Sequence, residues 1–322
     1  MKNHIYIYSP SGAVRDRSAF KRGIKRLQTL GYEVEIDEAA LARHLRFAGD
    51  DETRLAAIHR AAASGADVAL ITRGGYGLTR ILPGIDYAAI EKAIAKGLLF
   101  VGISDFTAFQ NAVLARTGGV TWAGPALCEG FGVGGSDMLP DDIMEACFDD
   151  IVTGQGEGTG WRQYREATLK TPESIAASAI SIRAESTFGI KNATLWGGNL
   201  SVLTSLLGTP YFPAIKGGIL FLEDVGEHPY RIERMLTQLL YAGVLAKQQA
   251  IVLGQFTEFK LVAHDRGFKL HTAVDWLRQH TQTPVLTNLP YGHVATKVML
   301  PVGATTELVV EGRDAMLFWG HL

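Results

Sequence analysis

Short apolar runs alternate, over the first half of the chain, with longer segments in which apolar residues recur every three or four positions. The runs predict strands at 5–8, 33–36, 68–72 and 99–103, and the spaced segments predict helices at 19–30, 51–64 and 87–96. Strands that alternate with helices are typical of a parallel sheet covered on both faces. Ligands bind at the carboxyl ends of the strands in such sheets, so the residues just after each strand are the first candidates for function.

The second half of the chain has a different pattern. Residues 154–190 are polar and rich in glycine at first, which predicts a connection between domains. Short strands are expected after it at 218–222, 250–253, 284–287, 298–300 and 307–310, with a helix between Pro229 and Gly243. We therefore predict an α/β fold of two domains with the active site at their junction: a doubly wound, mostly parallel sheet in 1–153, a linker in 154–190, and a smaller, β-rich mixed domain in 191–322.

Composition narrows the possible partners. A chain of 322 residues, 47% of them hydrophobic, can bury the cores of two domains. The formal net charge of −2 leaves no basic surplus for nucleic acid or an anionic membrane. The two cysteines, Cys128 and Cys147, have no C-x-x-C spacing, so neither a disulfide framework nor a zinc site is expected. No signal peptide and no run of roughly 18 apolar residues is found, and we expect a soluble, cytoplasmic protein.

The turn that follows the apolar run 98–101 carries the most informative residue, Ser104. Gly102, two positions earlier, lets the backbone bend sharply, as in the G-x-S-x-G turn that exposes a nucleophilic serine, although Phe106 stands where that pattern has its second glycine. The same turn could instead cap the helix that follows, through Ser104 or Asp105.

A glycine-rich loop, Arg73–Gly77, follows the strand predicted at 68–72. It lacks the lysine of a P-loop and the spacing of a dinucleotide fingerprint, so a nucleotide site is a weak hypothesis. Two interpretations remain open. The loop is a turn that needs positive φ, or it supplies a backbone N–H to an oxyanion hole beside Ser104, with Arg73 available for a substrate carboxylate.

An acid and a histidine later in the chain also follow apolar runs. Glu223 and Asp224 end the strand predicted at 218–222, and His293 follows a turn at 288–292. The order Ser, Glu, His is the order of α/β-hydrolase triads. Asp224 remains an alternative to Glu223 as the orienting carboxylate, and His228 is the main alternative to His293.

Further short blocks accompany these residues over nearly the whole chain, at 9–12, 46–49, 73–77, 102–108, 124–125, 195–200, 222–224, 227–236, 292–293 and 300–303. With these blocks the sequence resembles the LD-carboxypeptidase family of serine peptidases, the muramoyltetrapeptide carboxypeptidases. The resemblance implies hydrolysis of the L,D peptide bond that holds the terminal D-alanine of murein tetrapeptides, during cell-wall recycling in the bacterial cytoplasm. The substrate would be the tetrapeptide or its sugar-linked or nucleotide-linked forms, without metal or cofactor, and a homodimer is expected.

Residue roles follow from the same resemblance. Ser104 would be the nucleophile, His293 the general base, and Glu223 the carboxylate that orients the histidine. The backbone N–H groups of Asp105 and Gly75 would form the oxyanion hole. The candidates for binding substrate are Arg73, Gly74, Tyr76 and Arg231.

Two other functions remain as alternatives. The connection 154–190 looks longer than the family minimum and contains Trp161. The related microcin C immunity proteins share the triad but cleave acyl-nucleotide analogues and stack the base on a loop aromatic residue, a role that Trp161 could fill if it does not simply pack against a domain. A remoter alternative is a non-catalytic protein that binds a small ligand, with Ser104 as a helix cap.

Overall fold

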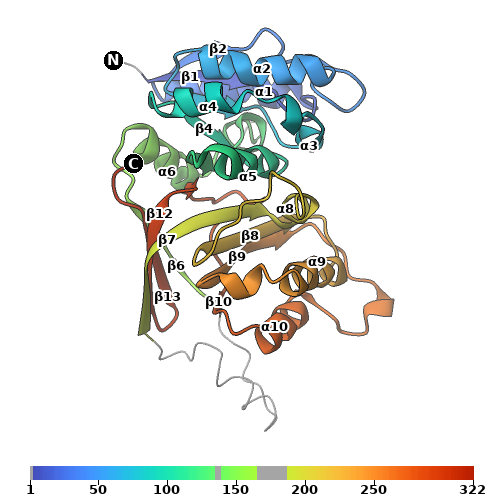
Figure 1. Cartoon of the computed structure of the whole chain (residues 1–322). Coiled ribbons are helices and arrows are strands. Elements are labelled where there is room, and N and C mark those ends of the chain that lie inside the picture. Colours follow the sequence, from blue (N-terminus) through green and yellow to red (C-terminus); the bar gives the residue numbers. More distant parts are fainter. Residues whose placement is uncertain (1–2, 135–138, 165–186) are drawn as a thin grey trace. The chain divides into compact units, whose positions relative to one another are not determined.

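The computed structural model describes residues 3–134, 139–164 and 187–322. The chain forms two compact units, each built around one sheet (Figure 1). The first unit comprises Met1–Gly156, Leu206–Pro213 and Ala295–Gly303, and the second comprises Glu157–Ser205, Ala214–Val294 and Ala304–Leu322. This division differs from the three consecutive segments expected from the sequence, because two short segments return to the first unit.

The first unit holds a six-stranded sheet in the order β11-β5-β4-β3-β1-β2. Its strands are β1 (His4–Tyr8), β2 (Glu33–Ile36), β3 (Val68–Ile71), β4 (Leu99–Gly102), β5 (Thr121–Ala123) and β11 (Leu300–Val302). All neighbouring strands are parallel except β11, which runs antiparallel to β5. The predicted parallel α/β sheet is thus confirmed. The strand expected near 298–300 belongs to this sheet rather than to the second domain, because its pairing partner is β5.

Helices connect these strands. They are α1 (Arg17–Thr29), α2 (Asp51–Ala63), α3 (Leu78–Ile81), α4 (Tyr87–Ile94), α5 (Phe106–Thr117) and α6 (Asp142–Val152), with short turns η1 (Leu82–Gly84) and η2 (Leu127–Phe131). An aspartate precedes each of α1, α2, α4 and α6 and accepts a hydrogen bond from a backbone N–H of the first turn. Such caps satisfy N–H groups that have no partner inside a helix, which explains why the helices begin where they do.

The strand order reverses between β1 and β3. From β1 the chain crosses to β2 on one side, and from β2 it crosses back over β1 to β3 and onward to β5. Because parallel crossovers are right-handed, α1 covers one face of the sheet and α2, α4 and α5 cover the other. The contacts agree, since α2 packs on α4 and α4 on α5, whereas α1 packs on η2. In sheets of this topology, the crevice at the reversal is the usual place for a ligand.

The second unit holds a seven-stranded sheet in the order β10-β9-β8-β7-β12-β13-β6. Its strands are β6 (Gly158–Arg162), β7 (Thr187–Asn199), β8 (Ile219–Val225), β9 (Ala250–Thr257), β10 (Val285–Leu286), β12 (Thr305–Glu311) and β13 (Asp314–Phe318). The strands from β10 to β7 are parallel, and those from β7 to β6 are antiparallel. Besides α8 (Leu200–Ser205) and the 3₁₀ turns η3 (Leu245–Lys247) and η4 (Ala263–Asp265), the unit has α9 (Pro229–Tyr241) and α10 (Leu270–His280), which pack against each other (Figure 1). The mixed, β-rich character predicted for this half is confirmed.

Part of the segment expected to be a linker belongs to this second sheet. Residues 158–162 form β6, which pairs with β13, and 187–190 begin β7, while 165–186 lie outside the described residues. Trp161 is 8% exposed, and its indole Nε1 donates to the carbonyl oxygen of Thr287 at 3.0 Å. The buried tryptophan is therefore a packing residue of the sheet. It offers no exposed ring on which a nucleobase could stack.

A loop between β2 and α2, residues 37–50, is fixed at its start by Asp37. The buried carboxylate accepts hydrogen bonds from Tyr6 Oη (2.7 Å), Arg60 Nε (2.7 Å) and Arg60 Nη2 (2.9 Å). Burial alone raises the pKa of Asp37, but the hydrogen bonds from Arg60, Tyr6 and the Ala39 backbone outweigh it and hold that pKa below its ordinary value. The charge of Asp37 is thus part of what orders the loop.

Replacing Asp37 by asparagine is expected to lower the free energy of unfolding by about 2 kcal/mol at pH 7, after allowance for the partial exposure of Arg60. Because the folded pKa is lowered, the stabilisation is present above the unfolded pKa of about 3.9 and is lost as the pH falls. Urea denaturation at pH 7 and in steps down to about pH 2, below the unfolded pKa, measures it. The control is Glu38→Gln, since exposed Glu38 pairs with the same Arg60 at 3.4 Å. Equal changes in the two variants would contradict the prediction.

Among the described residues, no helix combines the length and the apolar character needed to cross a membrane.

Candidate active site

Ser104 lies on the sharp turn between the end of β4 and the start of α5. Its φ is +67°, in the left-handed region that residues other than glycine rarely adopt. Such a strained strand-to-helix turn is how α/β-hydrolases expose a nucleophilic serine. In the first unit, no other described residue forms a hydrogen bond with the Ser104 hydroxyl. The hydroxyl is therefore available for chemistry.

The neighbouring Asp105 does not cap α5, although it stands at the N-cap position. Its buried carboxylate Oδ2 accepts hydrogen bonds from Ser11 Oγ at 2.5 Å and from the backbone N–H of Leu78 at 2.9 Å. Burial raises the pKa of Asp105 above its ordinary value. The carboxylate thus links the Ser104 turn to the loops that follow β1 and β3, and the alternative interpretation of the turn as a side-chain cap of α5 is not supported.

The glycine-rich loop after β3 lies directly against Ser104. A Cβ atom placed on Gly74 would lie 2.6 Å from Ser104 Cβ and 2.8 Å from its Oγ, so only glycine fits there. In the described part of the first unit, the backbone N–H groups of Gly75 and Asp105 donate no hydrogen bond. Two unused donors on the backbone beside the serine are what an oxyanion hole requires.

The remaining substrate-binding candidates divide between the units. Arg73 is buried in the first unit, where its Nε lies 3.4 Å from Glu129 Oε1. Tyr76 follows it on the surface. Arg231 lies on α9 of the second unit and forms an ion pair with Glu227, which precedes the helix by two residues, at 2.8 Å. That pair is ordinary for an exposed helix face and gives Arg231 no sign of a ligand role.

Glu223 and His293 come together in the second unit. His293 Nδ1 lies 2.8 Å from Glu223 Oε2, and Glu223 is 0% exposed. Asn199 on β7 donates from Nδ2 to the other carboxylate oxygen at 3.1 Å. With Nδ1–H donating to the carboxylate, the neutral imidazole has its acceptor lone pair on Nε2. This is the tautomer that a general base needs.

The alternative acid and histidine have other partners. Asp224 Oδ2 accepts from the Ser201 backbone N–H (2.9 Å) and Oγ (2.6 Å), so this carboxylate holds the start of α8. Burial, aided by the charge of Glu223, raises the pKa of Asp224. His228 Nε2 lies 3.1 Å from Asp265 Oδ2. Of the residues left open by the sequence, only Glu223 and His293 are paired with each other.

The backbone around Glu223 and His293 explains how the two side chains meet. The register of β8 against β9 shifts between Leu222 and Asp224, because Gly254 and Gln255 of β9 lie opposite the single residue Glu223, and such a bulge bends the strand that carries it. Gly292, just before the histidine, has a φ of +138°, and a Cβ there would lie 3.0 Å from the Gln255 carbonyl oxygen and 3.2 Å from Glu223 Oε2. A glycine is thus required where the loop passes the carboxylate.

Replacing Gly292 by alanine is therefore expected to destabilise the protein by roughly 1–3 kcal/mol and to displace His293 from Glu223. Thermal denaturation measures the first effect, and the histidine NMR spectrum measures the second. Gly226→Ala is the control, because Gly226 also has a positive φ (+74°) but has no atom within 4 Å of its Cβ position. An unchanged His293 signal in Gly292→Ala would contradict the prediction.

Sequence reasoning named the main residues but missed Asn199 and the role of Gly292. Asn199 stands at the end of a strand and before a helix, much as Glu223 does. This shared position is the feature of the sequence that could have identified Asn199 as a site residue. The need for glycine at 292 follows from the approach of Gln255 and Glu223, which no local pattern reveals. Among the described residues no group of three or more histidine, cysteine, aspartate or glutamate side chains is placed to hold a metal ion.

A strained serine turn with unused backbone donors and a buried glutamate–histidine pair are the components of a serine hydrolase. The model of the LD-carboxypeptidase N-terminal domain matches residues 5–124, and that of the LD-carboxypeptidase C-terminal domain matches 192–308. The chain belongs to the LD-carboxypeptidase family and is an enzyme of that class.

Individual relatives agree with this assignment. The crystal structure of muramoyltetrapeptide carboxypeptidase from Oxalobacter formigenes is similar with a TM-score of 0.83 and 38% identity, covering 99% of each chain. The probable murein peptide carboxypeptidase of Bacillus subtilis (strain 168) is 30% identical over 90% of this chain and 84% of its own length. The microcin C7 self-immunity protein MccF of Escherichia coli is 27% identical over 95% of this chain and 90% of its own length.

Proposed function

We propose that this enzyme releases the terminal D-alanine of murein tetrapeptides, with Ser104 as nucleophile, His293 as general base and Glu223 as the carboxylate that orients the histidine. The observation that carries the proposal is the left-handed backbone of Ser104. This conformation is energetically unfavourable for serine, and no side-chain cap of α5 compensates for it. The paired Glu223 and His293 support it, since they hold a histidine in the tautomer of a base. The relatives named as murein peptide carboxypeptidases support the choice of substrate.

The reaction follows the chemistry of acyl transfer. His293 Nε2 takes the proton of the Ser104 hydroxyl while Oγ attacks the carbonyl carbon of the L,D peptide bond. The proton then passes to the nitrogen of the departing D-alanine, which leaves an ester between Ser104 and the shortened peptide. Water attacks this ester and gives a proton to His293, which passes it to the departing Ser104 Oγ, so that the tripeptide is released and the serine hydroxyl is restored. The buried Glu223 carboxylate stabilises the imidazolium in both steps.

The negative oxygen of each tetrahedral intermediate would be bound by the N–H groups of Asp105 and Gly75. Their lack of other acceptors in the described part of the first unit supports this role. The loss of one such donor costs about 2.7–4 kcal/mol in other serine hydrolases. A large share of the rate enhancement is therefore expected from backbone atoms that the close fit of Gly74 against Ser104 keeps in place.

The cellular setting is part of the same proposal. We infer that the enzyme works in the cytoplasm as a homodimer, on tetrapeptides that are free, sugar-linked or nucleotide-linked, because it resembles the family that recycles murein in this way. Gel filtration with light scattering tests the dimer, and a comparison of the three substrate forms tests the preferred one.

Ser104→Ala is expected to abolish the release of D-alanine, with a loss of at least about a thousandfold in kcat/KM, while thermal stability is retained. Mass spectrometry of the tetrapeptide before and after incubation measures it. Ser205→Ala is the matched control, because Ser205 lies exposed on α8 with its hydroxyl bonded only to the Val202 carbonyl oxygen among the described residues.

Two outcomes would contradict the proposal when the same assay is also run with aspartyl sulfamoyl adenosine, the ligand of one MccF structure. A tetrapeptide left intact by the unmodified protein would favour a binding protein. Cleavage of aspartyl sulfamoyl adenosine without cleavage of the tetrapeptide would move the enzyme to the immunity class. Against the latter, Trp161 is buried and hydrogen-bonded rather than presented to a base.

A further inference from the structure

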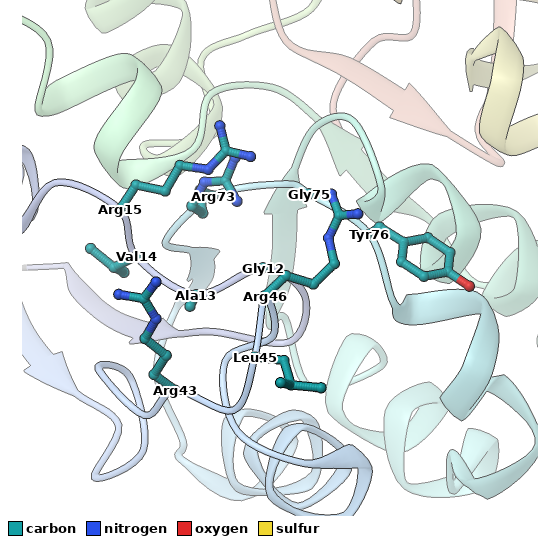
Figure 2. A pocket seen from close by; sticks show the side chains of 10 residues that line it. All are labelled: Gly12, Ala13, Val14, Arg15, Arg43, Leu45, Arg46, Arg73, Gly75 and Tyr76. Carbon is teal, nitrogen blue, oxygen red and sulfur yellow. The ribbon is translucent and has the colours of Figure 1, made fainter.

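A pocket of about 310 Å³ in the first unit extends from Gly75, the proposed oxyanion-hole residue, to residues that have no role in the proposed chemistry. Three segments line it, at 12–15, 43–46 and 73–76, and each follows one of the strands β1, β2 and β3 (Figure 2). The pocket therefore lies at the carboxyl ends of the strands, at the reversal of strand order between β1 and β3. This is the place where sheets of this topology bind ligands.

Positive charge dominates the pocket. Its lining includes Arg15, Arg43, Arg46 and Arg73, and it includes no acidic residue (Figure 2). Arg73 lies 3.4 Å from Glu129, whereas the ion pairs found among the described residues include none to the other three arginines. Neighbouring guanidinium groups repel one another unless an anion lies between them, so the charge of this pocket is matched to an anionic ligand.

The loop that carries Arg43 and Arg46 is held in place. The backbone N–H of Ala13 donates to the Arg46 carbonyl oxygen at 3.0 Å, and Phe47 forms a β-bridge with Gly12. The guanidinium of Arg46 lies over the ring of Tyr76 at 5.7 Å. These contacts join all three segments of the pocket, which is therefore formed before a ligand arrives.

Backbone strain marks the same loop. Leu45 has a φ of +54°, and its side chain is 76% exposed at the pocket. An exposed leucine in the left-handed region has no packing reason to be there, and strained residues of this kind cluster at ligand sites. Leu45 adds an apolar surface next to the arginines, which suits a ligand with both an anionic group and a small alkyl group.

The pocket adjoins the serine turn through the glycine-rich loop. Gly75 lines the pocket and has the unused N–H described above, and the neighbouring Gly74 lies against Ser104. The Gly74 carbonyl oxygen also accepts from the backbone N–H of Gly12 at 3.2 Å. A substrate whose scissile carbonyl lies at Ser104 would thus have its nearest charged group within reach of the arginines.

We propose that this arginine pocket binds the free C-terminal carboxylate of the peptide, and so restricts the enzyme to the last residue of its substrate. The inference rests on the proposed function and adds to it the residues that select a free chain end. Arg73, fixed next to the glycine-rich loop, forms the inner part of the site, and Arg15, Arg43 and Arg46 form its rim.

The test compares two substrates, the tetrapeptide with a free D-alanine carboxylate and the same peptide ending in D-alaninamide. The unmodified enzyme is expected to cleave the amide about a hundredfold less efficiently in kcat/KM. Arg15→Gln and Arg43→Gln are expected to lower kcat/KM for the free acid about tenfold or more, mainly by raising KM, and to leave the amide nearly unaffected. Arg73→Gln should show the same selectivity if it folds. Arg15 and Arg43 are exposed, so the variants at these two positions test the proposal even if Arg73→Gln does not fold.

The control is Arg17→Gln, which removes the same charge from an exposed position that does not line the pocket. It should leave both substrates unaffected. Equal cleavage of acid and amide by the unmodified enzyme would overturn the pocket assignment while leaving the peptidase intact. Failure to cleave either peptide would instead overturn the proposed function. Loss of activity in the arginine variants only with nucleotide-linked tetrapeptide would assign the pocket to phosphate and overturn the carboxylate proposal.

Discussion

The buried carboxylate of Asp105 is the interaction on which the first unit's site depends. It accepts from Ser11 after β1 and from Leu78 after β3, and it directly follows Ser104 after β4. Three loops that are far apart in the sequence are thereby fixed at one end of the sheet. Burial of a carboxylate is costly unless it is hydrogen-bonded, so these bonds cannot be given up without loss of the turn that strains Ser104. The open N–H of Gly75 and the arginine pocket lie on the same linked loops.

A second buried carboxylate organises the other unit. Glu223 lies on β8 opposite a bulge of β9, and Asn199 and His293 bond to its two oxygens. The adjacent Asp224 also accepts from Asn199, at 3.0 Å, but its other oxygen bonds to Ser201 and holds the start of α8. The two neighbouring acids thus share Asn199 but have different tasks, because Glu223 bonds to His293 and Asp224 bonds to Ser201. The sequence alone left this choice open.

Much of the site was predictable because, within each sheet, parallel strands present their carboxyl ends at the same edge. Ser104, Glu223 and the glycine-rich loop each follow an apolar run, and this position is readable in the chain. Of the arginines that line the pocket, the sequence indicated only Arg73 as a candidate for binding substrate. Arg15, Arg43 and Arg46 lie in segments without a motif of their own, and they meet Arg73 only because β1, β2 and β3 are neighbours in the sheet. Trp161 likewise becomes buried through non-local contacts, the pairing of β6 with β13 and the hydrogen bond to Thr287.

The sequence by itself determined the alternation of strands and helices, the aspartate caps, the serine turn, and the order of serine, glutamate and histidine. Each of these depends on local spacing or on a few adjacent residues. Only the tertiary structure decided that Leu300–Val302 joins the first sheet, that Glu223 rather than Asp224 bonds to His293, and that four arginines line one pocket. Those outcomes depend on strand order and on which groups share a buried space, and such non-local contacts leave no periodic signal in the chain.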